Sequence, residues 1–158
     1  MTSLDELVAL DLLTLAEHTA ASGDVLDAAS QRQLLERTLP TAELLAVRRD
    51  GALVAYALLR PQEAGRWFVL GFNTHPAHRD AAVFRELFER IGTLARQRGI
   101  ASLQSNVYRT NRLSMTFHRR LGFRVTREGE KGVEFTATLA ELAAASPALR
   151  AQASRPGA

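Results

Sequence analysis

The sequence contains no cysteine, and Lys131 is its only lysine. The first absence excludes disulfides, thiolate nucleophiles and sulfur ligands for metals. No apolar run approaches the ~18 residues that a membrane span requires, and the first residues, MTSLDELVAL, lack the cationic start and cleavage site of a signal peptide. These absences predict a cytoplasmic protein without a membrane partner.

The composition that remains is typical of a globular protein. The 158 residues are 46% hydrophobic and 23% charged, which is enough to bury a core. The formal net charge of +3 is too small to indicate nucleic-acid binding. We expect one domain over residues 1–142 and a disordered tail over residues 143–158, where the chain is small, polar or proline-containing.

Two helices are expected before any strand. Ser3 and Glu6 have the spacing of a capping box, which predicts a helix from this point towards Ser22-Gly23. A second helix is predicted from about Asp24 to Leu39, and Pro40 ends it.

A hairpin and a third strand are expected next. Asp50-Gly51 supplies a tight turn between two apolar runs within residues 43–61. Both faces of these strands are apolar, so we expect the sheet to be covered on both sides. The run RWFVLGFNTHP predicts a third strand, in which Gly71 marks a bulge or a close approach of backbone.

The clearest helix is predicted over residues 80–98. Its apolar positions recur at helical spacing, and Gly99 ends it. A strand follows up to Tyr108, and it should run parallel to the third strand. A short helix and a hairpin through Gly129–Gly132 complete an α/β fold with a mixed sheet between helices. The apolar positions of the long helix are Phe84, Leu87, Phe88, Ile91, Leu94 and Ala95.

The short helix in the segment NRLSMTFHRRLGF carries two adjoining strips. Asn111, Ser114 and His118 fall within roughly 60° of arc at about 100° per residue. Leu113, Phe117 and Leu121 form the neighbouring apolar strip. We expect the apolar strip to pack and the polar strip to face a cleft or water.

The junction HPAHRDAAVF, between the third strand and the long helix, is a candidate phosphate site. Helix N-termini present free backbone N–H groups to anions, and Arg79 adds a permanent cation. The alternative is that Arg79 is a solvated turn residue.

The segment from Trp67 to Phe123 resembles the GNAT superfamily of acetyl-coenzyme A-dependent N-acetyltransferases. Pro76 and Arg79 match the first family motif, and the second is matched by Asn111, Ser114, Phe117 and Leu121-Gly122-Phe123. The resemblance implies a GNAT-like fold, acetyl-CoA as co-substrate and an amine as acceptor. The family's usual first strand is missing here, which leaves an exposed edge and hints at a homodimer.

The resemblance also implies which residues touch the cofactor, with departures in the phosphate loop. Ala82 stands where a glycine is usual, Phe84 where the family has Gly or Ala, and Asp80 adds a carboxylate near the anion. The expected cofactor-binding residues are Phe72, Thr74, Arg79, Asp80, Ala81, Ala82, Val83, Phe84, Asn111, Ser114 and Phe117.

Four residues are candidates for catalysis. His118 stands where the resemblance implies a tyrosine that protonates the leaving thiolate, and a protonated imidazole can do the same. His75 is the candidate base, and Asn73 can orient its water. Tyr108 is a second candidate acid. The alternatives are a partly exposed helix residue for His118, a turn residue for His75 and packing for Tyr108. The resemblance implies an oxyanion-binding backbone N–H near Gly71–Asn73.

Three hypotheses follow. The leading one is direct acetyl transfer from acetyl-CoA to a primary amine, since a thiol acyl-enzyme is excluded. The second is a non-catalytic acyl-CoA-binding or protein-interaction module. The third, nucleic-acid binding, depends on a cluster of six arginines that is also read as a solvated surface. No metal-ligand spacing is evident. The six arginines are Arg109, Arg112, Arg119, Arg120, Arg124 and Arg127.

Overall fold

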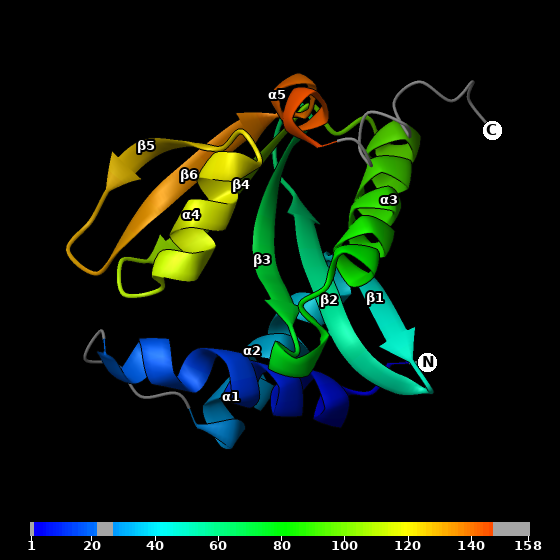
Figure 1. Cartoon of the computed structure of the whole chain (residues 1–158), viewed down its shortest axis with the longest axis vertical. Coiled ribbons are helices and arrows are strands. Elements are labelled where there is room, and N and C mark those ends of the chain that lie inside the picture. Colours follow the sequence, from blue (N-terminus) through cyan, green and yellow to red (C-terminus); the bar gives the residue numbers. More distant parts are fainter. Residues whose placement is uncertain (1, 22–26, 147–158) are drawn as a thin grey trace. The chain divides into compact units, whose positions relative to one another are not determined.

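The computed structural model describes residues 2–21 and 27–146 (Figure 1). The chain forms two compact units. The first runs to Arg60 and includes Leu70–Leu87, and the second contains Pro61–Val69 and the chain from Phe88 onwards. A single domain over residues 1–142 stays a prediction, and most of the expected tail, residues 147–158, lies outside the described residues.

The described elements confirm a mixed α/β architecture. Six strands form one sheet in the order β1-β2-β3-β4-β6-β5. In chain order the elements are α1 (Leu4–Ala21), α2 (Ala28–Thr38), η1 (Leu39–Thr41), β1 (Glu43–Arg49), β2 (Ala52–Pro61), β3 (Arg66–Thr74), η2 (Pro76–His78), α3 (Ala81–Arg98), β4 (Ser102–Tyr108), α4 (Arg112–Arg120), β5 (Arg124–Glu128), β6 (Gly132–Thr138) and α5 (Leu139–Ala145).

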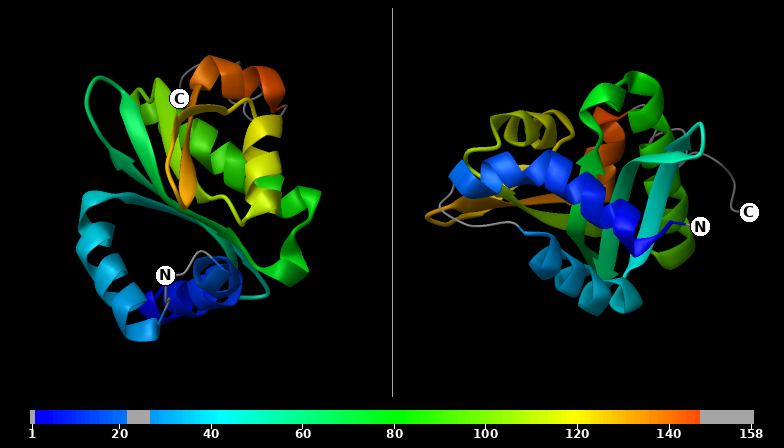
Figure 2. Two further views of the ribbon diagram at one scale, coloured as in Figure 1. Left: turned by 90° about the vertical axis from the view of Figure 1, so that its left-hand side faces the viewer. Right: turned by 90° about the horizontal axis from the view of Figure 1, so that it is seen from below.

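In the first unit, α1 and α2 lie side by side (Figure 2). The predicted capping box is present, because Ser3 N–H donates to Glu6 Oε1 at 2.9 Å and Glu6 N–H donates to Ser3 Oγ at 3.2 Å. The second helix begins later than expected, since Asp27 is its N-cap and accepts from the Ser30 N–H. The buried cluster of this unit joins both helices to β2, and its members are Leu7, Val8, Leu10, Leu35, Leu53, Tyr56 and Leu58.

The β1–β2 hairpin forms as predicted. Asp50 and Gly51 have positive φ angles of 52° and 80°, which the tight turn requires. Residues 53–59 of β2 are all buried, so side chains on both faces of this strand are covered. The strand β1 lies at an edge of the sheet, and no strand precedes it in the described chain. Dimerisation through this edge stays a prediction.

Gly71 is a point of close approach, as its place inside a strand predicted. A Cβ built on Gly71 would lie 2.9 Å from the Tyr56 hydroxyl oxygen and 3.0 Å from a carbon of its ring. The missing side chain therefore lets β3 lie directly against the phenol ring of Tyr56.

In the second unit, β3 and β4 are parallel, as predicted. Their register runs from the pair Arg66 and Ser102 to the pair Val69 and Ser105. The strand β4 also pairs along its whole length with β6 in the antiparallel sense, and β5 pairs with β6. Ser105 therefore lies at the last paired position between the two parallel strands.

The long helix α3 matches its prediction except at one apolar position. Val83 is fully buried, whereas Phe84, the expected first member of the apolar stripe, is only partly buried. Val83 therefore takes the core position that was expected for Phe84 at the start of this helix.

The prediction for the two strips of α4 is wrong in part. Leu113, expected to pack, is 63% exposed, and His118, expected at a cleft or water, is only 8% exposed. The His118 ring instead packs between Phe123 and Phe135, with centroid distances of 5.0 Å to each. An imidazole can replace an aliphatic side chain in a core when its two nitrogens find partners inside.

The helix α5 was not predicted. Thr138 and Glu141 form a capping box at its start, the same spacing that identified the first helix. Residues 143–145, expected in the tail, belong to this helix, and Ser146 is buried. Among the described helices none is long and apolar enough to cross a membrane.

Candidate functional site

The turn between β3 and α3 is held in place by His75. Its backbone N–H donates to the Val54 carbonyl at 2.7 Å, and its Nδ1 accepts from the Ala77 N–H at 3.0 Å. Because Nδ1 accepts a hydrogen bond, the neutral ring carries its proton on Nε2. The unprotonated nitrogen of His75, Nδ1, therefore already accepts a hydrogen bond within the turn.

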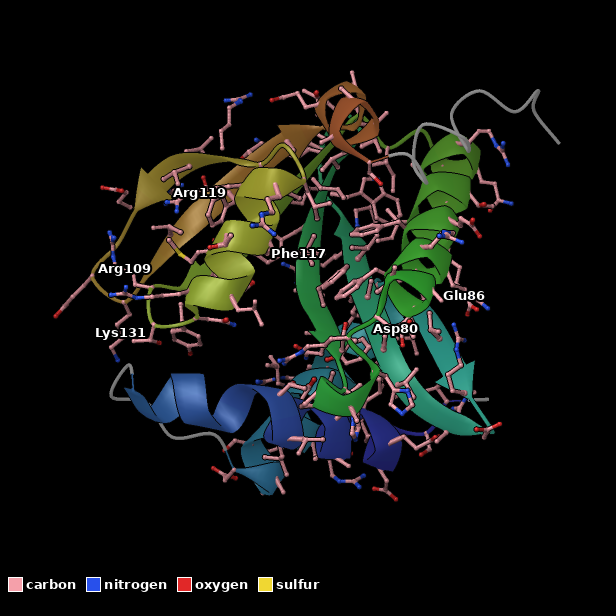
Figure 3. All side chains as sticks on the ribbon, viewed as in Figure 1. Asp80, Glu86, Arg109, Phe117, Arg119 and Lys131 are labelled. Atoms are coloured by element: carbon pink, nitrogen blue, oxygen red, sulfur yellow. The ribbon has the colours of Figure 1, made fainter. Side chains whose placement is uncertain are left out.

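The first turn of α3 contains one cation and one anion. Arg79 is exposed and makes no ion pair with any described residue. Asp80 lies where the helix begins (Figure 3), and its Oδ1 accepts from the Val83 N–H at 3.0 Å. The carboxylate thus occupies one of the N–H groups that a phosphate would use. Ala81 and Ala82 are exposed and leave the rest of this turn unobstructed by long side chains.

Thr74, at the end of β3, carries an orphaned hydroxyl. Its side chain is 6% exposed, and its Oγ1 is buried without a hydrogen-bond partner among residues 2–14 and 27–146. Buried hydroxyls are rarely left unpaired in native proteins. Thr74 therefore fits a position beside a polar ligand, and Phe72 is partly buried on the same strand.

The N-terminus of α4 is organised by Asn111. Its Oδ1 accepts from the Ser114 N–H at 3.1 Å, which is an N-cap and leaves the amide NH₂ pointing away from that bond. Phe117, one of the expected cofactor contacts, stacks on Phe88 with a centroid distance of 6.0 Å. The predicted residues of this motif are thus brought together at one end and one face of a short helix.

His118 and Ser105 form a buried pair. His118 Nδ1 lies 2.7 Å from the Ser114 carbonyl oxygen, and Nε2 lies 3.1 Å from Ser105 Oγ. A carbonyl only accepts, so Nδ1 carries a proton, and in the neutral ring Nε2 accepts from the serine hydroxyl. In this state His118 is a neutral base at Nε2 and has no spare proton to donate.

The pKa of His118 is lowered by burial, which disfavours the charged imidazolium, while the hydrogen bond to Ser114 opposes the shift. A general acid must first be protonated, so burial works against the role that the sequence suggested for His118. Sequence reasoning did not single out Ser105. Its signal was a serine at an inward-facing position of the strand, between the buried residues Leu103 and Val107.

A second buried polar group lies in the first unit, and we name it the Asp11 cluster. Asp11 on α1 accepts hydrogen bonds from Gln31 on α2, Tyr56 on β2 and Asn73 on β3. All four side chains are buried. The predicted site residue Asn73 is therefore held by a carboxylate.

Burial is the main cause of the altered acidities in the Asp11 cluster. It raises the pKa of the Asp11 carboxyl, although the three hydrogen bonds oppose the shift. Burial and the nearby carboxylate raise the pKa of the Tyr56 phenol well above its usual range. Sequence reasoning missed Asp11, Gln31 and Tyr56. Asp11 could have been noticed, because a lone carboxylate lies on the same helix face as Leu7 and Val8.

Tyr108 lies at the end of β4 beside a hollow of about 470 Å³. Charged side chains of both signs line this hollow, among them Arg127, Lys131 and Glu134. Figure 3 shows Arg109, which follows β4, close to Lys131 in the β5–β6 turn, and the Arg109 backbone N–H donates to the Lys131 carbonyl at 2.9 Å.

The six clustered arginines are exposed, and several have partners within the second unit. Arg109 Nε donates to the Gly129 carbonyl, Arg124 pairs with Glu141, and Arg127 pairs with Glu134. These contacts favour a solvated surface over a nucleic-acid site. In the described part of the chain, no three His, Cys, Asp or Glu side chains gather closely enough to hold a metal ion.

Comparison with known proteins identifies the family. The family model described as Acetyltransferase (GNAT) family matches residues 10–123, which include the β3–α3 junction and α4. None of the curated proteins is significantly similar to this chain in sequence.

Solved structures share the fold at low sequence identity. PaiA N-acetyltransferase from Thermoplasma acidophilum, in complex with coenzyme A, has a TM-score of 0.69 at 17% identity, over 85% of this chain and 92% of its own. Ribosomal-protein-S18-alanine N-acetyltransferase from Escherichia coli has a TM-score of 0.62 at 13% identity, over 87% and 90%. An acetyltransferase from Thermus thermophilus has a TM-score of 0.68 at 18% identity, over 85% and 90%. The chain therefore belongs to the GNAT family of acetyltransferases.

Proposed function

We propose that the protein transfers an acetyl group from acetyl-CoA to a primary amine by direct attack of the amine. The observation that carries the proposal is the family match over residues 10–123, which covers both motifs recognised in the sequence. Acetyl-CoA supplies the acetyl group as an activated thioester. No cysteine is present to form an acyl-enzyme through a thiol.

The residues at the β3–α3 junction fit the polar end of coenzyme A. Arg79 is a cation beside the start of a helix, without an ion pair to any described residue, and such sites favour phosphate groups. The Thr74 hydroxyl, which has no partner in the described part of the chain, supplies a further polar contact a few residues earlier. Asp80 opposes this binding, since its carboxylate already caps the helix. We expect binding that is measurable but weakened by this charge.

The remaining site residues have narrower roles in the proposal. The Asn111 amide contacts the pantetheine arm, and the backbone near Gly71–Asn73 donates to the thioester oxygen. His118 takes up at Nε2 the proton that the attacking amine loses and gives it to the sulfur of the leaving coenzyme A, with Ser105 as its hydrogen-bond partner. His75 and Tyr108 are second candidates for base and acid.

The alternative is a GNAT fold that binds an acyl-CoA or a protein without catalysis. Asp80 at the helix start and the buried, neutral state of His118 favour it. The acceptor remains a primary amine of unknown identity, on a small molecule or a peptide. A cytoplasmic location stays a prediction from the cysteine-free composition.

Two measurements test the proposal. Calorimetry with acetyl-CoA should give one site per chain, and an Arg79→Ala variant should bind more weakly. A thiol-release assay over a panel of amines should then show turnover. Binding without turnover favours the non-catalytic module. No heat at millimolar acetyl-CoA refutes acetyl transfer and leaves only the protein-interaction form of the alternative.

A further inference from the structure

Asp11 is a buried carboxylate whose partners among the described residues are all uncharged. It is 1% exposed. Its Oδ2 accepts from Gln31 Nε2 at 2.6 Å, and its Oδ1 accepts from Asn73 Nδ2 at 2.5 Å and from the Tyr56 hydroxyl. No Arg, Lys or His of residues 2–14 and 27–146 is among these partners.

Such a group is costly for a protein to keep. A carboxylate removed from water loses hydration that neutral donors replace only in part. An aliphatic side chain at the same place would extend the apolar cluster of Leu7, Val8 and Leu10 without that cost. Because the carboxylate costs stability at this position, we infer that Asp11 has a role other than packing.

The hydrogen bonds of Asp11 lead to one segment of β3. Asn73 belongs to this strand and also donates to the Tyr56 hydroxyl at 3.2 Å. Tyr56 in turn lies against Gly71, because its hydroxyl would be 2.9 Å from a Cβ at that position. Two of the three donors to Asp11 thus fix the strand between Gly71 and Asn73, and the third, Gln31, belongs to α2.

We propose that Asp11 is a positioning residue of the transferase, which holds the backbone of Gly71–Asn73 in place through Asn73 and Tyr56. The inference rests on the proposed function, in which this segment donates to the thioester oxygen. A donor that is fixed before the reaction stabilises developing charge better than a mobile one. Asn73 thereby takes a role besides the one expected, because its amide NH₂ donates to both Asp11 and Tyr56.

The first test measures the strand itself and needs no turnover. In hydrogen-exchange mass spectrometry, Asp11→Asn should speed amide exchange at least tenfold in peptides that cover residues 70–75. Gln31→Met is the matched control, since it too disturbs a hydrogen bond of Asp11, but one whose donor belongs to α2. It should leave these peptides unchanged within twofold. Tyr56→Phe keeps the ring and removes only the hydroxyl, so this variant replaces Asp11→Asn in the exchange experiment if Asp11→Asn does not fold.

The second test separates positioning from stability. At a temperature where all variants are folded, Asp11→Asn and Tyr56→Phe should lower kcat at least tenfold and keep the dissociation constant of coenzyme A within twofold. Gln31→Met should change neither kcat nor the dissociation constant of coenzyme A. Equal exchange and equal kcat in Asp11→Asn and Gln31→Met would overturn the inference. A wild-type protein that transfers acetyl to no amine refutes the proposed function instead, and faster exchange without loss of kcat refutes positioning alone.

Discussion

The buried state of His118 predicts how the stability of the protein changes with pH. Burial lowers the pKa of the imidazole in the folded chain, because it disfavours the charged form. In the unfolded chain its pKa returns to about 6.5. Below that value the unfolded chain binds a proton that the folded chain does not bind, so the free energy of unfolding falls as the pH falls.

The size of the effect follows from linkage. Each pH unit between the unfolded and the folded pKa removes at most about 1.4 kcal/mol. From pH 7 to pH 5, His118 therefore contributes a loss of up to about 2 kcal/mol if its folded pKa lies below this range. The pKa values of Asp27 and Glu141 are also lowered, by backbone hydrogen bonds at helix starts, and they add a loss at still lower pH.

The assay is urea unfolding of the wild type and of His118→Gln at several pH values. Glutamine cannot titrate, so the difference between the two proteins isolates the imidazole. We expect the variant to be less stable at pH 8, by about 1–3 kcal/mol because it loses buried contacts, and the gap to narrow towards pH 5. Parallel curves over this range would refute the neutral, buried assignment of His118.

Three further predictions concern single positions. Gly71→Ala should destabilise the protein by about 1–3 kcal/mol in urea unfolding, because its Cβ meets the Tyr56 phenol; a loss no larger than that of Gly129→Ala, whose nearest contact is 3.4 Å, would contradict this. Arg79→Ala should weaken coenzyme A binding at least fivefold in calorimetry at low salt, with a smaller effect at high salt, whereas equal affinities would place Arg79 outside the site. Asn111→Ala should lower stability by about 1 kcal/mol through the lost N-cap and also weaken coenzyme A binding, and a stability change alone would limit Asn111 to capping.

Much of the fold was predictable because local signals agreed with one another. Asp50-Gly51 has the turn residues that a tight hairpin needs, and Gly99 ends α3 with a positive φ of 65°. Gly122, with a φ of 97°, turns the chain after α4 as Leu-Gly-Phe suggested. The conformation at such positions depends on backbone sterics alone, so the residue type is enough to predict it.

The candidate site was less predictable, since its contacts join distant parts of the chain. Asp11 and Asn73 are 62 residues apart, and no local pattern pairs an acid in one helix with an amide in a later strand. The helical spacing places His118 on the same side of α4 as Ser114, but the burial of its ring depends on contact with Phe135 in β6. Periodicity predicts which residues share one side of a helix, but tertiary packing decides whether that side is buried or exposed to water.

The position of Lys131, the sole lysine, has a practical consequence for an acetyl-transferring protein. Its ammonium group belongs to the β5–β6 turn, on the rim of the hollow beside Tyr108. Any acetyl mark that the protein places on one of its own lysine side chains must therefore appear at this single turn. A mass shift there would report self-modification without ambiguity, and amine-reactive labels would attach a lysine-directed probe at one known place.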